Sequence, residues 1–188
     1  MVWSMLDRNC TLSYVWHMNH LASRSMVFAL LFTGTDLYQG KGFTFPKKES
    51  KATVVVFMSA VCPCSASHEK TVKELSEKYT KDGFEFVVVH SNQNEPAELA
   101  QNHFKDVGFG FPILEDRGAK IADRLKALKT PHAFIIQKDK VVFAGGVDDS
   151  ANAAESKIPF LANALEELKT NKPITVSSAR ALGCVIKR

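Results

Sequence analysis

Two cysteines that flank a proline stand directly after an apolar stretch, in the run Cys62–Pro63–Cys64. Residues 52–59 are apolar almost throughout, which predicts a strand covered on both faces, and a predicted helix begins at about residue 63. The N-terminus of a helix carries partial positive charge and unpaired N–H groups, and both stabilise a thiolate. Because the thiolate is the nucleophilic form of cysteine, this position predicts an activated thiol at Cys62. Burial of both cysteines as small core residues is the alternative.

The chain of 188 residues has four cysteines, which are too few for a disulfide scaffold. Cys62 and Cys64 lie two residues apart, whereas Cys10 and Cys184 lie near opposite ends, and this layout favours redox or metal chemistry. Cys184 could resolve an oxidised Cys62 by attacking its sulfur, or it could be an inert thiol. The tail after residue 173 is irregular in sequence, which predicts enough mobility for that attack. Cys10 stands in a stretch that no pattern places, and it is the weaker candidate.

Composition and charge are those of an ordinary globular domain. Hydrophobic residues make up 45% of the chain and charged residues 23%, so one packed core is expected. The net charge of +4 comes from scattered Lys and Arg residues rather than from a basic patch, and we therefore expect no nucleic-acid partner.

The first 35 residues are predicted to be an N-terminal extension or a signal segment, and the domain is expected to span 36–188. The apolar run 26–32 is far too short to span a bilayer as a helix, so no stable membrane span is predicted. It could be the core of a signal peptide or a segment packed on the domain. Residues 36–50, with two glycines and a proline before a charged cluster, predict a loop that leads into the domain.

Apolar periodicity predicts alternating strands and helices after residue 50. The expected order is β-α-β-α-β-α-β-β-α, which is typical of an α/β domain with a mixed sheet and helices on both faces. Asp148 and Asp149, which follow the last hairpin, are expected in a solvated turn. The predicted strands are 52–59, 84–90, 111–114, 133–137 and 141–144, and the predicted helices are 63–79, 95–108, 118–128 and 159–169.

Three features of this chain resemble the thioredoxin superfamily: the strand that ends just before Cys62, the pair Thr130–Pro131 before a strand, and the closing hairpin and helix. The stretch 130–149 is similar to the redoxin branch, which is related to alkyl hydroperoxide reductases and thiol-specific antioxidants. The tail 182–187 is similar to that of a peroxiredoxin-like bacterial group. The resemblance covers about residues 50–188 and implies a thioredoxin-like, three-layer α/β/α fold.

The resemblance also implies roles for individual residues. Cys62 matches the nucleophilic cysteine of the superfamily, but Ser65 stands where the second cysteine of a C-x-x-C pair would be. Cys64 could instead resolve the intermediate, although a disulfide across so small a ring is strained, or it could be a spare thiol or a metal ligand. Pro131 matches a cis-proline beside the active cysteine, which would let the Thr130 backbone pair with a bound extended chain. An ordinary strand-entry proline is the alternative.

The predicted activity is therefore that of a thiol–disulfide oxidoreductase. Cys62 would be the nucleophile, Cys64 or Cys184 the resolving thiol, and Thr130 and Pro131 part of the substrate groove. The expected partners are protein or small-molecule thiols and disulfides, and no bound cofactor is implied because the electrons come from thiols. An oxidising compartment suits this chemistry, which favours a periplasmic or secreted protein.

A thiol peroxidase is one alternative to this activity. Ser59 matches the hydroxyl that peroxiredoxins carry three residues before the reactive cysteine. Val55 stands where they carry a proline, however, and no arginine can be assigned to the site from the sequence, so we rank peroxidase activity behind disulfide exchange.

A Cu(I)-binding assembly factor is a second alternative, with Cys62, Cys64 and His68 as ligands. Soft thiolates suit Cu(I), and the spacing from Cys64 to His68 places both on one face of a helix. The chain lacks the C-x3-C spacing of thioredoxin-fold copper chaperones, and His68 is expected to face solvent, so no metal is predicted.

Overall fold

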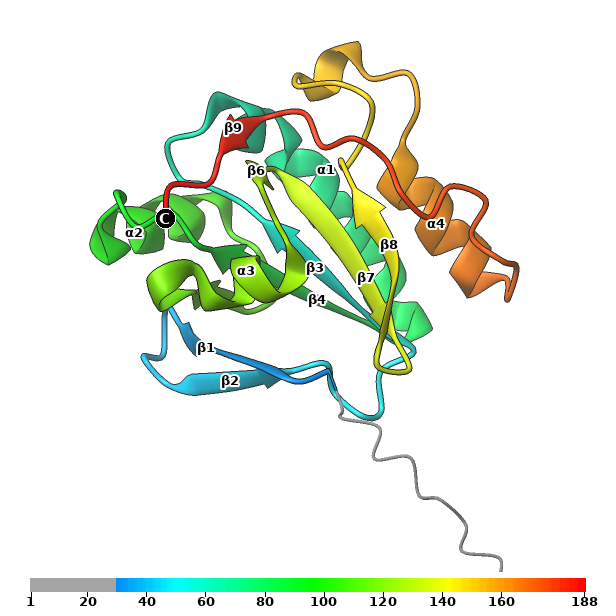
Figure 1. Ribbon diagram of the computed structural model, residues 1–188, viewed down its shortest axis with the longest axis horizontal. Coiled ribbons are helices and arrows are strands. Elements are labelled where there is room, and N and C mark those ends of the chain that lie inside the picture. Colours follow the sequence, from blue (N-terminus) through cyan, green and yellow to red (C-terminus); the bar gives the residue numbers. More distant parts are fainter. Residues whose placement is uncertain (1–29) are drawn as a thin grey trace, which may run out of the picture.

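The computed structural model describes residues 30–188, which fold around a mixed sheet in the order β2-β1-β5-β4-β3-β7-β8 (Figure 1). The strands of this sheet are β1 (Phe32–Asp36), β2 (Gly42–Phe45), β3 (Ala52–Phe57), β4 (Phe84–His90), β5 (Ile113–Glu115), β7 (His132–Gln137) and β8 (Lys140–Gly145). A second, two-stranded sheet joins β6 (Lys129–Thr130) to β9 (Cys184–Val185). The helices are α1 (Pro63–Tyr79), α2 (Ala97–Val107), α3 (Lys120–Leu125) and α4 (Phe160–Lys169), with short 3-10 helices η1 (Thr80–Asp82), η2 (Arg117–Ala119) and η3 (Ala153–Glu155).

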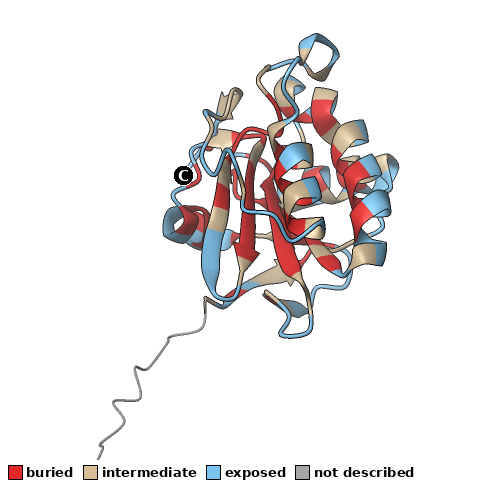
Figure 2. Cartoon of the chain, turned by 90° about the vertical axis from the view of Figure 1, so that its right-hand side faces the viewer, coloured by how far each residue is buried: buried red, intermediate tan, exposed pale blue. Residues whose placement is uncertain are grey.

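The two faces of the sheet carry different helices, which gives three layers. Side chains alternate along β3, so that Val54 and Val56 pack with α1, α2 and α4, while Val55 and Phe57 pack with α3. All six residues of β3 are buried, as its almost continuous apolar run predicts, and Figure 2 shows largely buried strands between layers of helices. The predicted three-layer architecture is confirmed, and so is the predicted order of the main-sheet strands and the α-helices from residue 52 onward, but β6 and β9 were not predicted.

The loop predicted over residues 36–50 is wrong, because this stretch contains β2. β1 and β2 form an antiparallel hairpin, and β1 joins the sheet beside β5. Phe45 of β2 is fully buried, and its ring stacks on that of Phe32 in β1 with the ring centroids 5.3 Å apart. The glycines and the proline around this four-residue strand obscured its alternating pattern. The sheet therefore includes residues 32–35, which were expected to belong to the N-terminal extension.

Two predictions about the N-terminus lie outside the described residues. They concern Cys10 and the signal-like part of the apolar run, residues 26–29. The end of that run is packed on the domain, because Phe32 is 1% exposed. Among residues 30–188, no helix combines the length and the apolar character needed to cross a membrane.

The C-terminal tail, for which the irregular sequence predicted mobility, is held on the domain by several contacts. β9 pairs antiparallel with β6, in a register that places Cys184 opposite Thr130. Ile186 then enters the core between the sheet and α3, where it is 2% exposed. Gly183 lies so close to Thr130 that a Cβ added to it would overlap the Thr130 carbonyl group. The tail thus returns Cys184 to the region where α1 begins (Figure 1).

We expect Ile186→Ala to lower the free energy of unfolding by about 2–4 kcal/mol, because it leaves a cavity in a packed core. Val185→Ala is the matched control, since Val185 is 53% exposed, and it should cost less than about 0.5 kcal/mol. Urea unfolding followed by circular dichroism measures both. Equal losses in the two variants would contradict the anchoring of the tail through Ile186.

Candidate active site

Cys62 stands immediately before α1 and is the cap residue of that helix. Its φ of −82° and ψ of 117° are extended, and Pro63 follows in the first turn, where its missing N–H leaves no hydrogen bond unmade. The side chain is buried, and Sγ donates to the carbonyl oxygen of Thr130 at 3.2 Å. The backbone therefore holds this sulfur at a helix N-terminus and against the loop that contains Thr130.

That loop carries the proline that the resemblance singled out. The Thr130–Pro131 peptide bond is cis, and both residues are buried. The Thr130 hydroxyl has no hydrogen-bond partner among the described residues, so it is available to donate to a thiolate on Cys62. The structure thus brings Thr130 and Pro131 to the site in which the sequence predicted them.

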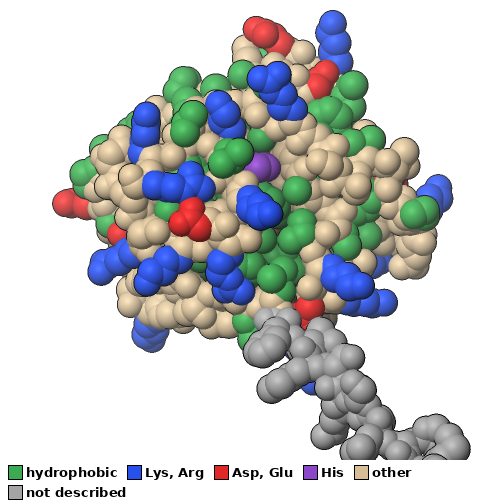
Figure 3. All heavy atoms as spheres, in the orientation of Figure 1, with side chains coloured by type: hydrophobic (Ala, Val, Ile, Leu, Met, Phe, Trp, Pro, Cys, Tyr) green, Lys and Arg blue, Asp and Glu red, His purple; other side chains and the backbone are tan. Residues whose placement is uncertain are grey.

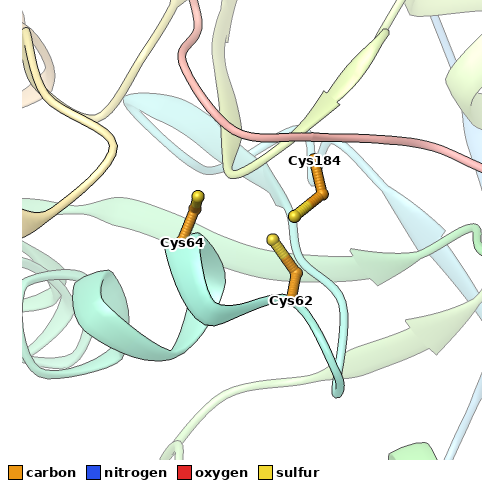
Figure 4. Close-up of side chains that lie close together, drawn as sticks. All are labelled: Cys62, Cys64 and Cys184. Carbon is orange, nitrogen blue, oxygen red and sulfur yellow. The ribbon is translucent and has the colours of Figure 1, made fainter.

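Three thiols gather at this point (Figure 4). The Sγ atoms of Cys62, Cys64 and Cys184 all lie within 4.8 Å of one another. Cys64 projects from the first turn of α1 and Cys184 from β9, and both side chains are half-buried. Figure 4 shows the side chains of Cys62 and Cys184 pointing toward one another, while that of Cys64 projects from the start of the helix to one side of them. All three are free thiols.

Hydrogen bonds make Cys62 the acidic member of this group. Burial by itself raises the pKa of the Cys62 thiol. A thiolate on Cys62 can accept hydrogen bonds from the Cys184 thiol, the Thr130 hydroxyl and the backbone N–H of Ser65, and these donors oppose burial. Together they lower the pKa of Cys62 to about 7, so that much of it is thiolate at neutral pH. The N–H of Ser65 is one of the unpaired donors that the start of a helix provides.

The pKa values of the other two thiols shift upward. Burial is the first cause for both Cys64 and Cys184. The negative charge on Cys62 raises the pKa of Cys64 further, and Cys184 holds its proton because it donates that proton to the Cys62 sulfur. At neutral pH the group therefore places its negative charge on Cys62, beside two protonated thiols.

His132 follows the cis-proline but brings no positive charge to the thiols at neutral pH. Burial lowers the pKa of His132 to about 4. Its ring packs on that of Phe134 with centroids 4.4 Å apart, and its Nδ1 accepts a hydrogen bond from the Leu128 N–H at 3.3 Å. The thiolate is therefore stabilised by neutral donors and the helix terminus, not by this imidazole.

A buried carboxylate holds the loop that leads to Cys62. Glu95 Oε1 accepts from the Ser59 hydroxyl at 2.6 Å, and Glu95 Oε2 accepts from the Ala60 N–H at 2.9 Å. Because the Ser59 hydroxyl is buried and bound to Glu95, the peroxidase alternative gains no support from it. The sequence placed Glu95 at the opening of a helix and did not reveal its role at the site. The one signal of that role was an acidic residue shortly after the end of an apolar strand.

Two further side chains complete the surroundings of Glu95. His90 Nε2 lies 3.1 Å from Oε2, and the Asn92 amide donates to Oε1. Burial raises the pKa of Glu95, but its hydrogen bonds, that with His90 first, outweigh burial and lower this pKa to about 2. The carboxylate thus stays ionised and organises its donors across the physiological pH range.

The expectation that His68 faces solvent is wrong, and so is the solvated turn expected for Asp148. His68 is fully buried, and Asp148 is 5% exposed. His68 Nδ1 donates to the Cys64 carbonyl oxygen at 2.7 Å, while Nε2 lies 3.1 Å from Asp148 Oδ1. The segment after β8, which includes η3, covers this face of α1, and sequence spacing could not show that cover. Because both ring nitrogens are engaged, the proposed ligand set of Cys62, Cys64 and His68 is not assembled.

The fold and the group of thiols define an oxidoreductase of the thioredoxin-like superfamily. The sequence model of the Redoxin family matches residues 33–165, and the chain belongs to this family. It is 27% identical over 131 residues to the thiol–disulfide oxidoreductase ResA of Halalkalibacterium halodurans. That alignment covers 68% of this chain and 73% of the relative.

Solved structures share the fold of this chain. An uncharacterised conserved protein from Geobacillus kaustophilus superposes with a TM-score of 0.76 at 26% identity, over 84% of this chain and 88% of that one. A secreted disulfide oxidoreductase from Mycobacterium tuberculosis superposes with a TM-score of 0.52 at 19% identity, over 60% of this chain and 81% of that one, and shows the shared fold. The predicted redoxin branch and the thiol–disulfide oxidoreductase class are confirmed.

Thr130→Val removes a hydroxyl but keeps the shape of the side chain, so the pKa of Cys62 should rise above its value of about 7. A rise of half a unit would slow alkylation of Cys62 by iodoacetamide about threefold at pH 6. Mass spectrometry of the alkylated protein across pH 5–9 gives the midpoint for Cys62. Thr44→Val on the exposed edge strand β2 is the control. If the alkylation midpoint of Cys62 is the same in both variants, the Thr130 hydroxyl does not stabilise the thiolate.

We expect Glu95→Gln to lower the free energy of unfolding by about 2–4 kcal/mol, because an amide leaves buried donors without an acceptor. Glu98→Gln, at an exposed position of α2, is the matched control and should change little. Because the folded state lowers the pKa of Glu95 from 4.5 to about 2, its contribution is complete above pH 4.5 and is lost as the pH falls toward 2. Denaturant titrations at pH 7 and pH 3 measure both effects. A loss for Glu95→Gln that is as large at pH 3 as at pH 7 would argue against the ionised carboxylate as its cause.

Proposed function

We propose that Cys62 is the attacking thiol of this thiol–disulfide oxidoreductase and that Cys184 is its resolving thiol. The observation that carries the proposal is the direct approach of the Cys184 side chain, on β9, to that of Cys62, at the start of α1 (Figure 4). A lowered pKa on Cys62 and a raised one on Cys184 fit an attacking thiolate beside a proton-bearing partner.

The cycle has two exchange steps. The Cys62 thiolate attacks one sulfur of a substrate disulfide, a mixed disulfide forms, and the other substrate sulfur leaves as a thiolate that takes a proton. Cys184 then loses its proton and attacks the Cys62 sulfur, which forms a Cys62–Cys184 disulfide and releases the second substrate thiol. The substrate gains two electrons from the enzyme and two protons, one from Cys184 and one from solvent, into which Cys62 released its proton when it ionised. A dithiol reductant restores the enzyme by the reverse steps.

The charge on Cys62 supports this order of events. Before the first step, Cys184 keeps its proton partly because it donates to the Cys62 sulfur and lies near its charge. In the mixed disulfide that charge is gone, so the two causes that come from Cys62 disappear, while burial and the neighbouring Cys64 still raise the pKa of Cys184. Cys184 therefore becomes a better nucleophile only once there is an intermediate to resolve.

Cys64 is the less suitable resolving thiol. It stands in the first turn of α1, two residues after Cys62, and a disulfide between them would close a very small ring. Cys184 comes from a separate strand and needs no change in the helix. The neighbouring Cys64 thiol keeps its proton through burial and through the charge on Cys62.

The proposed substrates are disulfides and thiols of proteins or small molecules. In this fold the backbone at Thr130 was expected to pair with an extended bound chain, but here it pairs with β9. A small disulfide needs no such pairing, so we regard it as the better first substrate. Lys and Arg are spread over the face in Figure 3, with apolar and acidic side chains among them, and form no single basic patch on that face.

Cys184→Ser should stall after the first step, whereas Cys64→Ser should still form the internal disulfide. Reduced protein is treated with one equivalent of 5,5′-dithiobis(2-nitrobenzoate), digested with trypsin and analysed without reduction. The parent and Cys64→Ser should yield a disulfide that links peptide 52–70 to peptide 181–187. Cys184→Ser should keep the mixed adduct on peptide 52–70. An internal disulfide within 52–70 in the parent would show that Cys64 resolves and would overturn the proposal.

A further inference from the structure

The three thiols form an arrangement that disulfide exchange does not require. Exchange uses two sulfurs, yet Cys64 lies with Cys62 and Cys184 so that all three Sγ atoms are within 4.8 Å of one another. The three side chains come from the helix cap, the first turn of α1 and the C-terminal strand. They therefore converge on one point from two separate parts of the chain.

We propose that the reduced protein binds one Cu(I) ion between the sulfurs of Cys62, Cys64 and Cys184. Thiolates are soft ligands and select Cu(I) over harder cations. The three sulfurs are already close enough to share one ion, and each thiol that binds would release its proton to solvent. The ion would sit over the N-terminus of α1, whose partial positive charge offsets part of the negative charge of the sulfurs.

The donor set favours Cu(I) over zinc. A structural zinc site takes four ligands in a tetrahedron. Among residues 30–188, no histidine or carboxylate joins the group of three cysteines. His68, the nearest candidate by sequence, directs its ring nitrogens to the Cys64 carbonyl and to Asp148. A three-sulfur site without a fourth protein ligand suits an ion that accepts three-coordination.

The surroundings of the thiols suit an ion that is shielded from water on one side and accessible to a carrier or chelator on the other. The Cys62 side chain is buried, whereas those of Cys64 and Cys184 are half-buried. An ion bound by all three would be shielded on the Cys62 side and approachable past the other two. This geometry would admit the ion from a small carrier or chelator without unfolding of the domain.

Copper binding and disulfide formation would exclude each other. A Cys62–Cys184 disulfide, if it forms as proposed above, removes two of the three ligands. Binding by the reduced protein does not itself depend on that redox cycle, so the two proposals can fail separately.

The test is an anaerobic competition between reduced protein and the Cu(I) chelator bicinchoninate. All proteins carry Cys10→Ser, which removes the cysteine that lies outside the described residues. The protein with this substitution alone is the reference, and its comparison with the parent chain gives the effect of a Cys→Ser change away from the three thiols. We expect one Cu(I) per chain, and at least a hundredfold weaker binding in Cys64→Ser and in Cys184→Ser. Circular dichroism verifies that each variant is folded. X-ray absorption should find three sulfur ligands and no nitrogen around the copper.

Three results would overturn the proposal. They are affinity that is unchanged in Cys64→Ser or Cys184→Ser, more than one copper per chain, and a nitrogen ligand in the absorption spectrum. Zinc competition under the same conditions provides a further test, because tighter binding of Zn(II) than of Cu(I) would contradict the assignment of the site to Cu(I). Retained disulfide exchange in a protein that binds no copper would refute the copper site and leave the proposed function intact.

Discussion

The pairing of β9 with β6 is the contact on which the arrangement of the thiols depends. It places Cys184 opposite Thr130, whose carbonyl oxygen also accepts the hydrogen bond from Cys62. One residue of the cis-proline loop thus positions two sulfurs from distant parts of the chain. Ile186, buried in the core beyond β9, keeps the strand in this register. Without that anchor, Cys62 would face only its neighbour in α1.

The reactivity of Cys62 reflects a balance between burial and hydrogen bonding. Burial disfavours a thiolate, and a small apolar pocket alone would leave an inert thiol. Donors from three directions reverse that tendency: the helix N-terminus through Ser65, the loop through Thr130 and the tail through Cys184. The same contact keeps the proton on Cys184. The pKa of Cys62 is thus lowered and that of Cys184 is raised, by burial first and by Cys62 second.

Buried polar side chains hold the backbone on both sides of Cys62. Before it, Glu95 accepts from the N–H of Ala60. After it, His68 donates to the carbonyl oxygen of Cys64 and is itself paired with Asp148. Unpaired polar groups would be costly in these positions, so each network must be satisfied as a unit. The cysteine-bearing turn is consequently fixed at both ends by groups that take no part in exchange.

Local patterns in the sequence determined which elements form and where the reactive cysteine stands. The apolar run of β3 and the start of α1 follow from propensity and periodicity within a few residues, so the position of Cys62 and the layered α/β architecture could be predicted. Such patterns describe a residue only through its neighbours in the chain. The short strand β2 was missed because its flanking glycines and proline resemble a loop.

Only the tertiary structure decided which distant groups meet. His68 has the polarity and spacing of a surface residue, and it is buried because a segment after β8 folds over α1. Cys184 lies in a tail without periodicity, and its place beside Cys62 follows from pairing with β6 and burial of Ile186. These contacts depend on long-range packing, whose energy is absent from any local window of sequence. The sequence alone therefore indicated Cys62 as the nucleophile, with Cys64 or Cys184 as its resolving thiol, and the fold decided that both lie beside it.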